Sequence, residues 1–266
     1  MNLKFSKYHG TGNDFIIIDN RKNIFDPKNL TLVKKLCDRR FGIGADGLIL
    51  LNDSDKYDFR MDYFNADGNV GSMCGNGGRC IAAFARRLGI INIETAFDAI
   101  DGVHHARIEK YYPETMSANV FLKMNDVRKI EHDDDFTFID TGSPHYVKFV
   151  DDPNGLNIID EGKKIRYGER FRQNGVNVNF ISFKDDTLLI RTYERGVEDE
   201  TLSCGTGAVA AVLAAADKGL LNDKLHCTLI TRGGKLVVHF EKLTSGYENI
   251  FLEGPAAFVF DGEINI

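Results

Sequence analysis

Short runs of β-branched and aromatic residues recur along the chain and predict strands. They occupy residues 15–19, 48–51, 59–64, 146–150, 176–181, 188–193 and 236–240. In the runs 59–64 and 176–181 apolar residues alternate with polar ones, which is the period of a strand with one buried face. Strands therefore dominate the expected secondary structure.

Three segments predict helices, at residues 30–37, 75–88 and 205–218. The two longer segments are each followed by a glycine, Gly89 and Gly219, which suits a helix C-terminus. Residues 81–85 and 208–216 are almost all apolar, and a helix without a polar face is buried on all sides. We therefore expect strands to wrap each long helix, and its N-terminal amides and positive dipole end to face a cleft.

An internal repeat relates the two halves of the chain at a shift of 130 residues. Cys74-Gly-Asn-Gly-Gly matches Cys204-Gly-Thr-Gly-Ala. The same shift pairs positions 11, 12, 41, 63, 77, 85 and 89 with positions 141, 142, 171, 193, 207, 215 and 219. Because the matches need no insertion, the repeat predicts two copies of one α/β unit related by pseudo-twofold symmetry.

The expected fold class is α/β. It consists of two pseudo-symmetric domains, each a curled mixed or antiparallel sheet wrapped around a central buried helix. We expect the first domain to comprise residues 1–117 and the second residues 118–253, with the active site in the cleft between them.

Two cysteines at equivalent positions of a repeat suit acid/base chemistry at a carbon centre. Inverting such a centre requires a base on one face and an acid on the other, and two thiols can supply both. A helix N-terminus lowers the pKa of a thiol, so one cysteine can be a thiolate and the other a thiol near neutral pH. The glycines after each cysteine allow close approach of a ligand, whose carboxylate the first-turn amides can hold. This chemistry requires no cofactor.

Composition and charge narrow the functional classes. The chain has 266 residues, of which 43% are hydrophobic and 27% charged, as in ordinary globular proteins. Its net charge of −6 disfavours nucleic acid and anionic membranes as partners, because both require a basic surface. The longest apolar run, residues 208–216, is too short to span a bilayer, and no signal-peptide core follows the start. We therefore expect a cytoplasmic protein.

Other candidate sites have simpler explanations. We expect Cys37, Cys80 and Cys227 to be small, inert core residues, and five cysteines do not indicate a disulfide framework. Residues 42–47 match the dinucleotide pattern G-x-G-x-x-G, but they follow a helix and precede a strand, which is the wrong order. The charged segments 104–105 and 131–135 are typical of solvated loops, so no metal is expected.

The motifs of this chain resemble those of the diaminopimelate epimerase family nearly from end to end. They are HGTGNDF at 9–15, FGIGADG at 41–47, YFNADG at 63–68, MCGNGGR at 73–79, GSPH at 142–145, VNVN at 176–179, YERG at 193–196, CGTG at 204–207 and EGP at 253–255. The family consists of amino-acid epimerases that use two cysteines and no cofactor such as pyridoxal phosphate. The resemblance implies conversion of LL-2,6-diaminopimelate to the meso form, in lysine and peptidoglycan-precursor synthesis.

The resemblance also assigns roles to individual residues. Cys74 and Cys204 would be the acid/base pair, and His145 would assist thiol ionisation. The reacting amino acid head would be held by Asn13 and by the amides of Gly75, Asn76, Gly205 and Thr206. The distal head would be read by Asn65, Asn177, Glu194 and Arg195, because a guanidinium suits a carboxylate and Glu194 offsets an ammonium. A homodimer, and a tail of residues 254–266 returning to the first domain, are further implications.

Two positions depart from the family pattern. Gly47 stands where many members have Gln, and Ser143 stands where many have Asn. By the repeat, Gly47 is the partner of Asn177 and Ser143 the partner of Asn13, so each departure matches a presumed ligand in the other half. Polar contacts to the substrate are lost or replaced at these two places.

Two alternative functions remain open at this point. A proline-type racemase of similar fold also carries two Cys-Gly motifs, but proline has no second amino acid head for Glu194 and Arg195 to bind. A redox-switched thiol binding protein, in which Cys74 and Cys204 form a disulfide, would explain the thiols. It would not explain the amide-rich turns that follow them.

Overall fold

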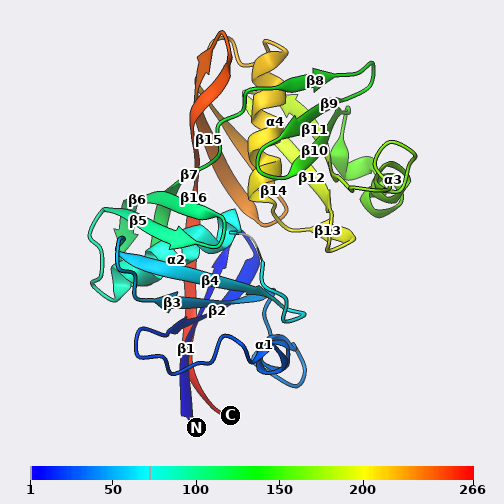
Figure 1. The fold of residues 1–266 in the computed structure, drawn as a ribbon. Coiled ribbons are helices and arrows are strands. Elements are labelled where there is room, and N and C mark those ends of the chain that lie inside the picture. Colours follow the sequence, from blue (N-terminus) through cyan, green and yellow to red (C-terminus); the bar gives the residue numbers. More distant parts are fainter. Residues whose placement is uncertain (1, 72) are drawn as a thin grey trace. The chain divides into compact units, whose positions relative to one another are not determined.

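A computed structural model describes residues 2–71 and 73–266 of the chain. The chain divides into two compact units, of which unit 1 comprises Met1–Leu122 and Gly254–Ile266 and unit 2 comprises Lys123–Glu253. The fold is mixed α/β and consists mostly of strands (Figure 1). The described residues form four α-helices, α1 (Leu30–Cys37), α2 (Gly75–Arg87), α3 (Ile158–Arg166) and α4 (Gly205–Asp217). None of the helices in the described part of the chain is long and apolar enough to cross a membrane.

The sheet of unit 1 closes on itself around α2. Its strands are β1 (Asn2–Gly10), β2 (Asn13–Asp19), β3 (Gly47–Asn52), β4 (Phe59–Asn65), β5 (Glu94–Ala99), β6 (Gly102–Tyr112), β7 (Ser117–Lys123) and the later part of β16 (Gly246–Asn265). They follow one another in sheet order, and β16 pairs with β1. The enclosed helix α2 contacts β1, β2, β3 and β6, and its residues 75–85 are all buried. The expected burial of this helix on all sides is confirmed.

Unit 2 surrounds α4 in a corresponding way. Its strands are β8 (Ile130–His132), β9 (Thr137–Asp140), β10 (Pro144–Phe149), β11 (Asn177–Lys184), β12 (Thr187–Glu194), β13 (Asp199–Thr201), β14 (His226–Thr231), β15 (Gly234–Leu243) and the first part of β16. The order is β16-β15-β14-β12-β11-β10-β9-β8, with β13 beside β12. Helix α4 contacts β9, β10, β11, β12, β14 and β15.

The elements of the two units correspond at the repeat shift. Adding 130 to the bounds of α2 gives those of α4, residue for residue. In unit 1, β2 and β3 pair in parallel with Phe15 opposite Gly47, and in unit 2 His145 lies opposite Asn177, again 130 residues later. Adding 130 to the bounds of α1 gives 160–167, and α3 occupies Ile158–Arg166.

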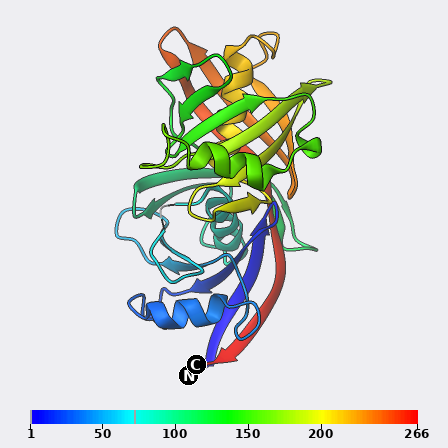
Figure 2. The ribbon, with the colours of Figure 1, turned by 90° about the vertical axis from the view of Figure 1, so that its right-hand side faces the viewer.

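Each unit has a second helix on the outside of its sheet. In unit 1, Val33 and Leu36 of α1 pack with Leu48 and Leu50 of β3 (Figure 2 shows α1 in blue). On the other face of this strand, the side chain of Ile49 comes within 3.2 Å of where a Cβ on Gly77 of α2 would lie. The strand is therefore buried on both faces.

The prediction of one buried face was wrong for the strand at 176–181. Residues 177–181 are all buried, because β11 is contacted by both α3 and α4. The prediction missed α3, and therefore the second helix that covers this strand. In β4 the expected alternation holds from Phe59 to Met61, with Arg60 exposed between them.

Candidate active site

Cys74 and Cys204 occupy the same structural position, the residue before the first turn of the enclosed helix. Each is the N-cap of its helix, α2 or α4, in an extended backbone conformation. The carbonyl of Cys74 accepts the first helical hydrogen bond from the amide of Gly78, and that of Cys204 accepts it from Ala208. Neither cysteine side chain makes a capping hydrogen bond, and the amides of the first helical turn have no acceptor within their own helix.

Around Cys74, three of the residues assigned to the site contact one another. The thiol of Cys74 donates to Asn13 Oδ1 at 3.5 Å, and Asn76 Nδ2 donates to the same oxygen at 3.2 Å. Cys74 itself is half-buried. Because Asn13 begins β2 and Asn76 lies in the first turn of α2, the sheet and the helix together set the position of this cluster.

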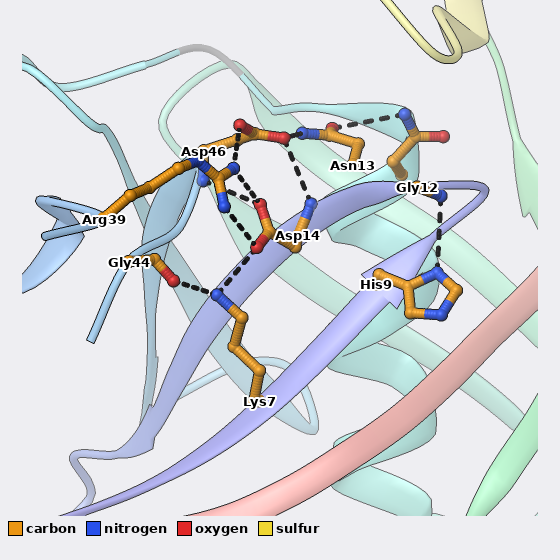
Figure 3. Close-up of polar contacts among 9 residues, drawn as sticks. Lys7, His9, Gly12, Asn13, Asp14, Arg39, Gly44 and Asp46 are labelled. Carbon is orange, nitrogen blue, oxygen red and sulfur yellow. Dashed lines mark hydrogen bonds and ion pairs between the residues drawn. The ribbon is translucent and has the colours of Figure 1, made fainter. Parts of the chain in front are cut away.

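A chain of charges fixes the orientation of the Asn13 amide (Figure 3). Asp46 Oδ2 accepts from Asn13 Nδ2 at 2.8 Å, so the amide oxygen faces Cys74. Arg39 bridges Asp46 and Asp14 at 2.7 Å each, and Lys7 contacts Asp14 at 2.8 Å. Burial raises the pKa of Asp14, but the hydrogen bonds and charges of Arg39 and Lys7 outweigh burial and lower this pKa to about 2.

The surroundings of Cys204 repeat part of this geometry. Cys204 is buried, and its Sγ lies 3.4 Å from Thr206 Oγ1. Thr141 Oγ1 donates to the carbonyl of Thr206 at 3.0 Å. In unit 1 the equivalent hydroxyl, on Thr11, lies 3.5 Å from Asn76 Oδ1. The repeat matches Thr11 with Thr141, but the sequence indicates no role for either residue, because only the fold places them against the helix.

His145 lies beside the first turn of α4 as a neutral imidazole. Burial, and then the charge of Arg195, lower the pKa of His145 to about 3. Asn179 Nδ2 donates both to the carbonyl of Tyr146 and to His145 Nδ1, each at 3.1 Å. Because Nδ1 accepts, the proton of the ring is on Nε2. Within residues 2–71 and 73–266 this buried Nε2 has no hydrogen-bond partner.

His145 and Cys204 both lie close to Gly207. A Cβ on Gly207 would lie 2.7 Å from Asn179 Oδ1, and 3.4 Å from both His145 Cε1 and Cys204 Cβ. A side chain at this position would therefore displace the residues that orient the imidazole. The sequence indicated no role for Asn179, but this residue fixes the tautomer of His145.

Of the residues assigned to the distal head, Asn177 and Arg195 are bonded to each other in unit 2. Asn177 Oδ1 accepts from the backbone amide of Arg195 at 2.9 Å, and its Nδ2 donates to Ser143 Oγ at 2.8 Å. Glu194 Oε2 accepts from Thr201 Oγ1 at 2.8 Å. The departure at Ser143 thus provides a hydroxyl that is hydrogen-bonded to Asn177, one of the presumed ligands.

The departure at Gly47 has a steric cause. A Cβ at Gly47 would lie 2.5 Å from the ring of Tyr63 and 3.0 Å from its hydroxyl oxygen. Tyr63 therefore fills the space that a side chain at position 47 would need. Asn65, two residues further along β4, is exposed in unit 1.

The remaining cysteines are buried thiols. Burial raises the pKa of Cys227 to about 11, that of Cys37 to about 12, and that of Cys80 further still. The interpretation of these three as core residues agrees with their burial. Across the described ranges 2–71 and 73–266, no three His, Cys, Asp or Glu side chains are grouped so as to hold a metal ion.

Comparison with solved structures supports the fold assignment. A phenazine biosynthesis protein of the PhzF family from Bacillus anthracis is similar, with a TM-score of 0.74 over the whole of both chains and 13% sequence identity. A methylitaconate-delta-isomerase matches with a TM-score of 0.67 and 13% identity, over 99% of this chain and 95% of its own. At these identities the likeness extends to the fold alone, which is a PhzF-like α/β fold with a β-barrel core.

Sequence comparison identifies the family. The family model for diaminopimelate epimerase matches residues 5–110 and 137–259. The diaminopimelate epimerase of Flavobacterium psychrophilum is 51% identical over 98% of this chain and 100% of its own length. That of Chlorobaculum tepidum is 43% identical over 97% and 99%. The chain therefore belongs to the diaminopimelate epimerase family, EC 5.1.1.7, the epimerases that act on diaminopimelate in lysine biosynthesis.

Proposed function

We propose that this protein converts LL-2,6-diaminopimelate to the meso form with Cys74 and Cys204 as a cofactor-independent acid/base pair. Family membership supports the reaction. The observation that carries the assignment of the residues is that both cysteines are the N-caps of equivalent, fully enclosed helices. The reaction also produces a precursor of peptidoglycan.

The mechanism follows from the positions of the two thiols. One cysteine, as thiolate, removes the proton from the reacting α-carbon, and the other, as thiol, returns a proton to the opposite face. Negative charge grows on the neighbouring carboxylate during this step. The amides of Gly75, Asn76, Gly205 and Thr206, at two helix N-termini, would hold that charge.

Side chains of both units would position the substrate. Asn13 Oδ1, held toward Cys74 by Asp46, is suited to accept a hydrogen bond from the reacting ammonium group. In unit 2, Asn177 and Arg195 are bonded to each other and, with Glu194, are suited to the distal head. We assign Asn65 to the same head on the family resemblance.

His145 would act on Cys204 as a hydrogen-bond donor. Its low pKa makes it a poor acceptor of the thiol proton, whereas its buried Nε2–H can donate to a thiolate. The structure thus supports assistance to thiol ionisation by a neutral imidazole.

We further propose that the two units are pseudo-symmetric domains with the substrate in a cleft between them, and that the protein is a cytoplasmic homodimer. The shared shift of 130 residues in helix bounds and strand pairing supports the symmetry. The cleft is required by the mechanism, because each thiol must reach one face of the same carbon.

Proton exchange in deuterated water tests the proposed function. LL-diaminopimelate is incubated with the wild type, Cys74→Ala, Cys204→Ala and the core control Cys37→Ala, and followed by NMR. We expect α-deuterated meso product from the wild type and from Cys37→Ala, and a loss of about 10²- to 10⁴-fold in both other variants. Epimerisation at the wild-type rate without either Cys74 or Cys204 would exclude the two-thiol mechanism. A proline derivative serves as the substrate control and should not react.

A further inference from the structure

We propose that Arg79, a buried arginine of α2, acts as a positioning residue that holds Cys74 as the thiolate of the pair before substrate binds, while Cys204 is the thiol. This inference rests on the proposed function, because it assigns a resting state to the two proposed acid/base groups. It adds a residue outside the substrate-binding set and makes the two cysteines different from each other.

The guanidinium of Arg79 is fully buried among neutral groups. Its exposed fraction is 0%. Nη2 donates to Asn76 Oδ1 at 2.8 Å and to Thr11 Oγ1 at 3.4 Å, Nη1 donates to the carbonyl of Gly75 at 3.3 Å, and Nε donates to that of Pro255 at 3.5 Å. In the part of the chain that the structure describes, no carboxylate pairs with it.

A buried cation of this kind requires compensation. Arginine stays protonated at physiological pH, and a charge buried without a counter-charge is costly. Burial lowers the pKa of Arg79, while attraction to the sulfurs of Cys80 and Cys74 raises it. One of these two cysteines is therefore the natural site for the compensating negative charge.

Cys74 is better suited than Cys80 to carry that charge. Cys80 is fully buried, and burial raises its pKa despite the attraction of Arg79. Cys74 is half-buried and lies at the N-terminus of α2, where the helix dipole favours an anion. Asn13 Oδ1 accepts from the thiol and favours the neutral form, but a neutral amide acts more weakly than a full positive charge.

Other charges around α2 have partners elsewhere. Helix α2 contacts β1, β2, β3 and β6, and Arg79 also reaches β16 through Pro255. Strand β3 carries no charged side chain, and in β16 Glu253 pairs with His239 and Asp261 with Arg87. The ion pairs on β1, β2 and β6 are Lys4 with Glu263, Lys7 with Asp14, Asp19 with Arg21, His104 with Asp101, and Arg107 with Glu109. His9 Nδ1 accepts from the amide of Gly12, His105 is exposed, and Lys110 lies over the ring of Tyr112.

The equivalent position in unit 2 carries no charge. Arg79 corresponds to Val209, which is fully buried in α4. Cys204 has the same helix dipole as Cys74, but the group beside it is the neutral His145. The two helix ends favour an anion at both cysteines. Arg195, whose charge acts on His145, is exposed and therefore screened by solvent, whereas Arg79 is fully buried, so Arg79 distinguishes the two cysteines.

The test is the pH dependence of alkylation at each cysteine, without substrate. The wild type is treated with iodoacetamide across pH 5–10, and modification is quantified per peptide by mass spectrometry. We expect the midpoint for Cys74 to lie below that for Cys204 by about one pH unit or more. Equal midpoints, or a lower midpoint for Cys204, would overturn the proposal, and this comparison does not depend on any variant.

Variants of Arg79 then test whether this residue causes the difference between the two midpoints. Arg79→Gln should raise the Cys74 midpoint by about one unit or more and leave that of Cys204 in place, and Arg79→Lys should restore most of the difference. Arg87→Gln, on the same helix but paired with Asp261, is the matched control and should change neither midpoint. An unchanged Cys74 midpoint in folded Arg79→Gln would refute the role of Arg79. The alkylation assay contains no substrate, so its result does not depend on epimerase activity. Failure of the proposed function would be detected separately, by the proton-exchange experiment.

Discussion

The orientation of two asparagine amides decides what the neighbouring functional groups can do. Asn13 gives its NH2 group to Asp46 and so presents its oxygen to Cys74. Asn179 gives its NH2 group to a backbone carbonyl and to His145, which fixes the ring proton on Nε2. In each case a hydrogen-bond partner, Asp46 or Asn179, determines whether the polar atom beside it is a donor or an acceptor.

The charged chain behind Asn13 makes stability depend on pH. The pKa of Asp14 is lowered in the folded state, so its ionised form stabilises the fold above the unfolded value near 3.9 and this stabilisation is lost as pH falls through about 2. With solvent screening through the partly exposed Arg39, we expect a contribution of about 1 to 2 kcal/mol at pH 7. Urea unfolding checks this. Asp14→Asn should be less stable than the wild type at pH 7, and the difference should vanish near pH 2.

At the scale of elements, the sequence predicts what is local. Both long helices begin and end within one residue of the predicted bounds, because a Cys-Gly start, an apolar body and a following glycine are all readable in one segment. Strands β1, β5–β9, β13, β14 and β16, and helix α3, were not predicted, because their mixed polar sequences form regular structure only through pairing and packing. The shift of 130 residues applied to α1 would have indicated α3.

The same limit applies to the candidate site. The repeat and the family motifs identify both cysteines and the amides that follow them. The roles of Thr11, Asn179 and Arg79 depend on contacts between residues far apart in the chain, such as Arg79 with Thr11, and no spacing within the sequence indicates them.

Equivalent glycines in the two enclosed helices should respond differently to substitution. At Gly207 a Cβ would press on Asn179 Oδ1 at 2.7 Å, whereas at Gly77 it would meet the flexible tips of Ile49 and Met61 at 3.2 and 3.3 Å. We expect Gly207→Ala to cost about 1 to 3 kcal/mol and to lower kcat, and Gly77→Ala to stay within about 1 kcal/mol of the wild type. Unfolding curves and steady-state kinetics measure both, and equal effects would contradict the role given to Asn179.

At the scale of the whole molecule, the two units share the positions of their elements but differ in the residues around the two cysteines. The cysteines and helix bounds are shared, but Arg79 corresponds to Val209 and His145 to Phe15. Such divergence suits a pair of groups that must hold different protonation states at any moment. On the proposed mechanism, the repeat would supply two equivalent thiols, and the different residues around them would make one the base and the other the acid.

The part of β16 that follows Glu253 should be essential for unit 1 and dispensable for unit 2. Ending the chain after Glu253 removes the partner of β1 and the carbonyl of Pro255 that binds Arg79. We expect amide hydrogen exchange in β1 and β2 to accelerate by at least about 100-fold, while exchange in β11 and β12 changes little. Removing only residues 261–266 is the milder control. Uniform acceleration in both units would contradict their independence.

The pairing of the first strand with the last also determines which unit is completed first during synthesis. β1 pairs with β16 from Asn2 opposite Asn265 to His9 opposite Ala257, and Figure 2 shows the two termini side by side. Unit 2 is continuous in sequence, whereas unit 1 needs both ends of the chain. A ribosome adding about 5–20 residues per second therefore synthesises all of unit 2 before it adds the last segment of unit 1. The half of the protein that is translated first is the half that is completed last.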